Sequence, residues 1–121
     1  MMPGGEFITD EYGNVIGIKE NTDEALADLK TAITTALEKC GLTAERYAKR
    51  KCPVDTGRLR NSITHRTDSD KKEVVIGTNV EYAPYVELGT SSQKAQPFLK
   101  PAVHDHEDRY RKIFESELKK L

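Results

Sequence analysis

The chain has 121 residues, of which 36% are hydrophobic, 32% are charged and none is tryptophan. A single domain is expected at this length, because two independent cores would each be too small. No stretch approaches the roughly 18 to 20 continuous apolar residues that a membrane-spanning helix needs. Residues 1–13 lack the basic and apolar regions of a secretory signal. We therefore expect neither membrane insertion nor secretion.

The charge is unevenly distributed along the chain, although the formal net charge is only −1. Residues 1–42 have a net charge of −5, residues 43–72 of +5 and residues 73–121 of −1. A nearly neutral total argues against a general nucleic-acid binder. Opposed charge regions suit a protein that meets copies of itself or charged neighbours, and the alternative is a basic stretch that is merely solvated.

The first predicted elements are a hairpin and a long helix. Residues 7–19 predict a small hairpin or extended arm around the turn signal at residues 12–14. We expect residues 1–20 to form this arm and residues 21–121 to form one domain. A helix is predicted from about Glu24, because apolar residues recur at helical spacing at Leu26, Leu29, Ile33, Leu37 and Cys40. It either continues to Lys51, over about 45 Å, or breaks at Gly41, which costs about 1 kcal/mol relative to alanine.

The remaining elements are short until the final helix. Pro53 ends the long helix, because a residue before proline disfavours helical backbone, and Asp55 or Thr56 suits the N-cap of one turn over residues 57–61. Residues 62–66 and 73–77 predict an antiparallel hairpin. Residues 82–89 have helix-like apolar spacing before a C-terminal glycine, and Pro101 suits the first turn of a closing helix. The predicted fold class is α+β, with a long N-terminal helix and a C-terminal helix packed on a small curled antiparallel sheet.

Side chains that could act in catalysis or bind metal are present without a recognisable arrangement. On a helix, His104 and His106 point in directions about 200° apart, and His104 with Asp108 provides too few ligands. Cys40 and Cys52 fall at apolar positions, which favours buried free thiols in a reducing compartment. The sequence contains no nucleophile elbow, Walker loop or dinucleotide-binding glycine motif. We expect no enzymatic activity, catalytic residue, metal, cofactor or small-molecule substrate.

A basic group forms the main candidate for recognition. Arg46, Lys49 and Arg50 are spaced to share one side of the long helix, and Arg58 and Arg60 follow. This group suits either the phosphates of DNA or an acidic neighbour, such as the N-terminal region of another copy.

Three runs of sequence, taken in order, resemble a known family. They are CPVDTGRLRNSI at residues 52–63, VEYAPYVELGT at 80–90 and QPFLKPAV at 96–103. Each run alone is weakly specific, but together they resemble the gene-product-ten family of the phage HK-ninety-seven type, which comprises small head–tail connection, neck or tail-completion proteins. The resemblance covers about residues 15–121.

The resemblance implies a non-enzymatic structural protein of a tailed phage or prophage that acts in head–tail joining or tail completion. It implies a ring subunit that contacts further copies of itself and phage head-connector and tail proteins, with contact to packaged DNA left open. Its location would be the virion, and the host cytoplasm during assembly. The alternative is a prophage-encoded nucleic-acid-binding accessory protein.

The resemblance also implies architectural roles for the matched residues. Phe98 is expected to be buried, and Glu87 has three open roles: a bond to Thr90, a backbone cap, or a pair with an arginine of another subunit. The full set is Pro53, Asp55, Thr56, Gly57, Leu59, Ser62, Tyr82, Ala83, Val86, Glu87, Gly89, Thr90, Pro97, Phe98, Pro101 and Ala102.

Overall fold

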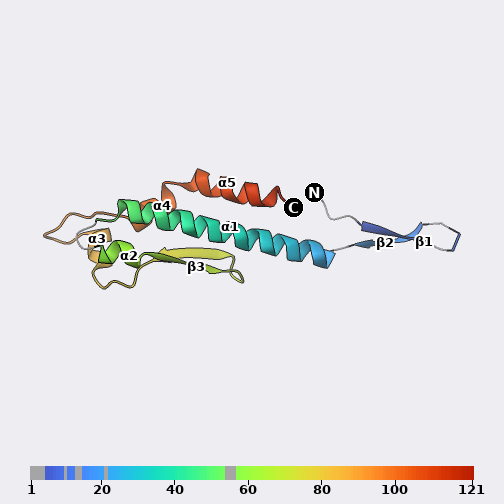
Figure 1. The fold of residues 1–121 in the computed structure, drawn as a ribbon, viewed down its shortest axis with the longest axis horizontal. Coiled ribbons are helices and arrows are strands. Elements are labelled where there is room, and N and C mark those ends of the chain that lie inside the picture. The colour runs from blue at the N-terminus through green and yellow to red at the C-terminus, as the bar shows by residue number, and fades with distance from the viewer. Residues whose placement is uncertain (1–4, 10, 13–14, 21, 54–56) are drawn as a thin grey trace.

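The computed structural model describes residues 5–9, 11–12, 15–20, 22–53 and 57–121. It confirms the α+β class, with a long N-terminal helix, C-terminal helices and antiparallel strands (Figure 1). The elements are β1 (Gly5–Thr9), β2 (Val15–Glu20), α1 (Thr22–Lys51), α2 (Arg58–Ser62), β3 (Thr64–Asp68), β4 (Glu73–Gly77), α3 (Ala83–Leu88), α4 (Leu99–His104) and α5 (Glu107–Leu118).

The predicted N-terminal hairpin is confirmed. Strands β1 and β2 pair in antiparallel fashion, with Phe7 opposite Ile18, and the register shifts between Ile8 and Thr9. Residues 13 and 14 of the predicted turn lie outside the described residues. The division of the chain into an arm and one domain stays a prediction.

Helix α1 is continuous over 30 residues and passes through Gly41 without a break. A Cβ atom at position 41 would lie 2.5 Å from His65 Cδ2 and 2.7 Å from Val74 Cγ2. Glycine therefore serves here to let the β3–β4 hairpin approach the helix closely, which explains a residue that otherwise weakens a helix. Acidic residues in the first turn and basic residues in the last turn suit the helix dipole.

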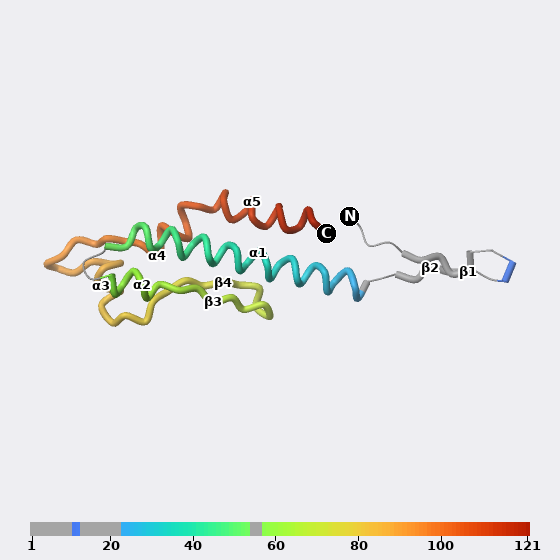
Figure 2. The backbone as a smooth tube through the Cα atoms, in the orientation of Figure 1, coloured from blue at the N-terminus to red at the C-terminus, as the bar shows by residue number. Residues whose placement is uncertain are grey.

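Helix α1 forms the middle layer of the molecule. The β3–β4 hairpin lies along one side of it, with His65 opposite Ile76, and α5 runs back along the other side (Figure 1). The C-terminal helix thus packs on α1 rather than directly on the sheet. The backbone trace shows that the predicted closing helix is two helices, α4 and α5, separated by a bend at residues 105 and 106 (Figure 2).

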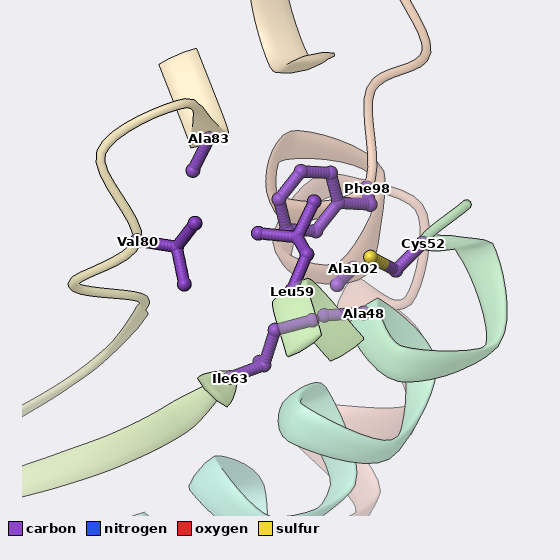
Figure 3. Packing of buried hydrophobic residues seen from close by; sticks show 8 residues of the cluster. All are labelled: Ala48, Cys52, Leu59, Ile63, Val80, Ala83, Phe98 and Ala102. Carbon is purple, nitrogen blue, oxygen red and sulfur yellow. The ribbon is translucent and has the colours of Figure 1, made fainter. Parts of the chain in front are cut away.

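A cluster of buried hydrophobic side chains lies near the C-terminal end of α1 (Figure 3). Phe98 and Ile63 are its largest fully buried side chains, and burial of one such side chain stabilises the fold by about 1.5–3 kcal/mol. Small α1 residues allow close packing there. The cluster comprises Ala48, Cys52, Leu59, Ile63, Val80, Ala83, Phe98 and Ala102.

The opposite end of α1 departs from the predicted apolar face. Leu37 and Cys40 are buried as expected, but Leu26 and Leu29 are exposed to solvent. Helical spacing identifies the apolar side of a helix, but it does not show how far along that side other elements reach. The predicted buried free thiols are confirmed, because Cys40 and Cys52 are both buried and unpaired.

Candidate functional site

Side-chain contacts join the first and second sequence runs near the C-terminal end of α1, where the core cluster lies. The two terminal nitrogens of Arg58 donate to the two carboxylate oxygens of Glu81, at 3.1 and 3.0 Å. The guanidinium carbon of Arg58 also lies 5.6 Å from the centre of the Tyr82 ring. The paired guanidinium lowers the pKa of Glu81. This pair is solvent-exposed, so it orients α2 against the chain entering α3 more than it adds stability.

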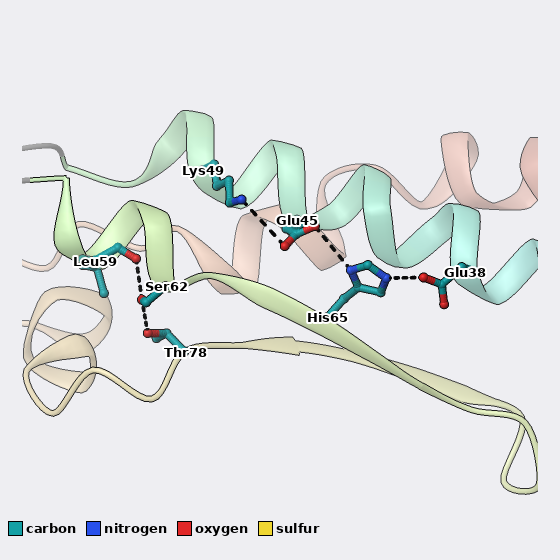
Figure 4. Close-up of polar contacts among 7 residues, drawn as sticks. All are labelled: Glu38, Glu45, Lys49, Leu59, Ser62, His65 and Thr78. Carbon is teal, nitrogen blue, oxygen red and sulfur yellow. Dashed lines mark hydrogen bonds and ion pairs between the residues drawn. The ribbon is translucent and has the colours of Figure 1, made fainter.

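A hydroxyl relay makes a second link between the same two runs (Figure 4). The Ser62 hydroxyl donates to the Leu59 carbonyl at 2.6 Å and also contacts the Thr78 hydroxyl oxygen. That Thr78 oxygen accepts the Val80 backbone N–H at 3.1 Å. The relay fixes the turn that leads from β4 toward α3.

The Glu87 carboxylate joins the second and third runs. Its Oε1 atom accepts the backbone N–H groups of Phe98 at 3.0 Å and Leu99 at 2.9 Å, and Oε2 accepts that of Lys100 at 3.3 Å. These N–H groups begin α4 and have no partner within the helix. The sequence left three roles open for Glu87, and the structure shows that it caps the backbone at the start of α4. Thr90 instead donates its own N–H to the Gln93 carbonyl at 2.8 Å.

Two glycines of the runs have left-handed backbone. Gly57 and Gly89 both have a φ of 79°, which glycine adopts without strain. Gly89 ends α3, and a Cβ atom there would lie 2.7 Å from the Ala95 backbone nitrogen. Gly57 holds the N-cap position of α2 without a side-chain cap. Asp55 and Thr56, the two residues predicted to cap this turn, lie outside the described residues, so their capping role stays a prediction.

The other matched residues surround the same end of α1. Pro53 follows the last turn of α1, and Pro101 lies in the first turn of α4, where a missing N–H is tolerated. Pro97 is exposed. Leu59, Ala83, Phe98 and Ala102 are buried, and Tyr82 and Val86 pack against them.

The five basic candidates do not form one uniform surface. Lys49 lies 3.7 Å from Glu45, which also contacts the β3 strand (Figure 4). Arg50 lies over the Tyr47 ring at 5.9 Å, and that ring stacks on His106 at 3.5 Å, at the bend between α4 and α5. Arg46 and Arg60 are exposed, whereas Arg58 pairs with Glu81. Arg46, Lys49 and Arg50 keep the predicted helical spacing. Lys49 is held by a glutamate, however, whereas Arg50 lies over an aromatic ring.

A histidine clamp between α1 and β3 was not predicted from the sequence. His65 Nε2 lies 2.6 Å from Glu38 Oε1, and His65 Nδ1 lies 3.3 Å from Glu45 Oε2 (Figure 4). The bond to Glu38 is the main cause that raises the pKa of His65. The Thr67 hydroxyl, at 2.6 Å, and then His65 lower the pKa of Glu38. The sequence feature that could have indicated this contact is the pair Glu38 and Glu45, which lie about one helical turn on either side of Gly41.

No arrangement for metal chemistry or membrane insertion is found in the described part of the chain. It contains no group of three or more His, Cys, Asp or Glu side chains that could hold a metal ion. None of its helices has the length and apolar character needed to cross a membrane. A surface hollow between α1 and the β3–β4 turn is lined mainly by polar side chains, including Lys30, Thr34 and Ser69, together with Ile33.

Comparison with known proteins identifies the family. Residues 17–89 match the family described as "Bacteriophage HK97-gp10, putative tail-component". This chain belongs to that family. The match includes the first sequence run and all of the second except its last residue, Thr90, and it ends before the third. No curated protein and no solved structure matches the chain. Membership of the HK97-gp10 family indicates a structural role in phage tails and hence a place in the virion.

Proposed function

We propose that this HK97-gp10 family member is a non-enzymatic subunit of a ring that joins the phage head to the tail or completes the tail. The observation that supports this most is the convergence of all three sequence runs on one end of α1. Glu87 and the Arg58–Glu81 pair connect these runs through backbone and side-chain bonds. They stabilise the shape of this end, as expected of a surface that must fit repeatedly against neighbours.

The partners in this proposal are other copies of the chain, the head connector and tail proteins. Arg46, which precedes the first run, and Arg60, which lies within it, are exposed and carry charge available for such contacts. They face either an acidic protein surface or the DNA that passes through the joint. Contact between complementary charges favours correct docking over wrong partners.

The direct test is deletion and restoration of the gene in the phage or prophage that encodes it, followed by negative-stain electron microscopy. DNA-filled heads beside separate finished tails, rescued by the gene, would support head–tail joining. Heads with tails that are unfinished or abnormal in length would support tail completion. Complete, infectious particles without the gene would contradict both roles and favour the nucleic-acid-binding alternative.

A charge-reversal variant tests the role of the basic residues in the same system. Arg46→Glu, Arg50→Glu and Arg60→Glu together should prevent rescue, because they invert the exposed charge at the C-terminal end of α1 and on α2. Lys49 is left intact, since it pairs with Glu45 beside His65. The matched control is Arg109→Glu, Lys112→Glu and Lys119→Glu, three exposed residues on or just after α5. Rescue by the first variant would contradict a basic contact.

A further inference from the structure

Two pairs of apolar side chains are exposed on separate helices. In α1, Leu26 is 51% exposed and Leu29 is 37% exposed. In α3, Tyr85 is 60% exposed and Leu88 is 78% exposed. Each pair is spaced by three residues and so shares one face of its helix. Helix α3 lies at the end of the molecule where α1 finishes, far from the first turns of α1 (Figure 1).

Leu26 and Leu29 are exposed because α5, which packs along α1, ends before it reaches the first turns of α1. The same apolar side of α1 continues into Leu37 and Cys40, and the Cys40 thiol contacts the Tyr110 carbonyl of α5. Near the end of α5, Glu117 pairs with Lys39. Helix α5 ends at Leu118, so the first turns of α1 extend past it (Figure 2). This leaves Leu26 and Leu29 partly exposed on the apolar side of α1, at 51% and 37%.

The two ends of α1 carry opposite charge, and the exposed Glu81 just before α3 is paired with Arg58. Asp23, Glu24 and Asp28 are exposed around the leucines at the start of α1. At the other end, the last turn of α1 is basic and ends in exposed Lys51, and Arg60 is exposed on α2. The one carboxylate within α3, that of Glu87, is occupied by backbone N–H groups.

We propose that the start of α1 in one copy docks on α3 of the next copy. Leu26 and Leu29 then lie against Tyr85 and Leu88, with the acidic first turns facing the basic end of α1. The two surfaces differ, so the contact is head to tail and repeats around a ring when the rotation closes. This inference rests on the proposed function and names the surfaces through which the ring subunits meet.

Cross-linking within purified particles tests this contact. The variant Leu29→Cys with Leu88→Cys is used to restore the deleted gene, and the particles are treated with a bis-maleimide. The two native cysteines are buried. We expect a ladder of covalent multimers on a denaturing gel from the double variant. Each single variant should remain monomeric, as should the control that combines Leu88→Cys with Glu115→Cys, an exposed position on α5.

The outcomes separate this contact from the proposed function. A ladder from the double variant alone supports head-to-tail docking. A dimer from either single variant would show a symmetric contact and overturn the inference. A chain that is present in the particles but gives no ladder would overturn the contact and leave the proposed function standing. Absence of the chain from finished particles would overturn both.

A second variant pair gives an independent measurement. Leu26→Asp with Leu29→Asp should abolish the rescue of particles, because it places two charges at the apolar contact. Leu26 is 51% and Leu29 37% exposed, so the isolated protein should stay folded, with a urea midpoint only modestly below that of the wild type. Full rescue by this stable variant would overturn the proposed contact.

Discussion

The Oε1 atom of Glu87 accepts the backbone N–H of Phe98 at 3.0 Å, although the two residues are 11 positions apart in sequence. The same carboxylate binds the next two N–H groups, and the Gln96 N–H donates to the Val86 carbonyl at 2.8 Å. These bonds hold the start of α4 against α3. They place the fully buried Phe98 side chain in the centre of the core.

Removal of the Glu87 carboxylate should lower the free energy of unfolding of the protein. Glu87→Ala leaves three N–H groups at the start of α4 without their acceptor, and we expect a loss of about 1–3 kcal/mol in the free energy of unfolding. Glu87→Gln should lose less, because its amide oxygen still accepts. Urea unfolding monitored by circular dichroism measures both. Glu81→Ala, which removes an exposed ion pair, is the control and should cost less than Glu87→Ala. Equal losses at the two positions would contradict a capping role.

Gly41 should resist substitution although it lies within a helix. Alanine favours the helix by about 1 kcal/mol, but its Cβ atom would lie within 2.7 Å of both the His65 ring and Val74. We expect overpacking to dominate, with a net loss of about 1–3 kcal/mol. Gly77→Ala in β4 is the control, since a Cβ atom there meets nothing within 4 Å. A thermal midpoint raised by Gly41→Ala would contradict the close approach of hairpin and helix.

The His65 clamp should make stability depend on pH. The folded state raises the pKa of His65, mainly through the bond to Glu38. The stabilisation is therefore complete below the unfolded pKa, about 6.5, and is lost as the pH rises through the folded value. The groups facing His65 are Glu38 and Glu45, and Lys49 pairs with the latter.

Urea midpoints measured from pH 6 to pH 8.5 test this dependence. The difference between the wild type and His65→Gln should be largest at pH 6 and should shrink toward pH 8.5. His104→Gln, which changes an exposed histidine, should follow the wild-type curve. Parallel curves for the wild type and His65→Gln would show that the clamp does not bind a proton more tightly in the folded state.

The two thiols should react slowly in the folded protein. Burial raises the pKa of both Cys40 and Cys52, and the thiolate is the reactive form. Labelling with a disulfide-exchange reagent at pH 8 should be slow in buffer and rapid in urea. Rapid labelling of both thiols in buffer would contradict the packing of α1 against its neighbours.

Local signals in the sequence predicted the elements better than the contacts between them. Apolar spacing and Pro53 located α1 and its end, but they did not show whether Gly41 breaks the helix, since the answer depends on His65 and Val74 from another element. The cap provided by Glu87 was one of three alternatives because its partners lie in a different run. The bend before α5 was missed for a similar reason: His106 stacks on Tyr47 of α1.

The position of the chain in finished particles tests the proposed role most directly. Gold-labelled antibodies raised against the chain can be imaged on intact and on gently dissociated particles by negative-stain electron microscopy. A subunit that joins head to tail or completes the tail should be labelled at the junction between head and tail, or at the head-proximal end of separated tails. Label confined to the distal tail tip, or particles that lack the chain, would contradict the proposed role.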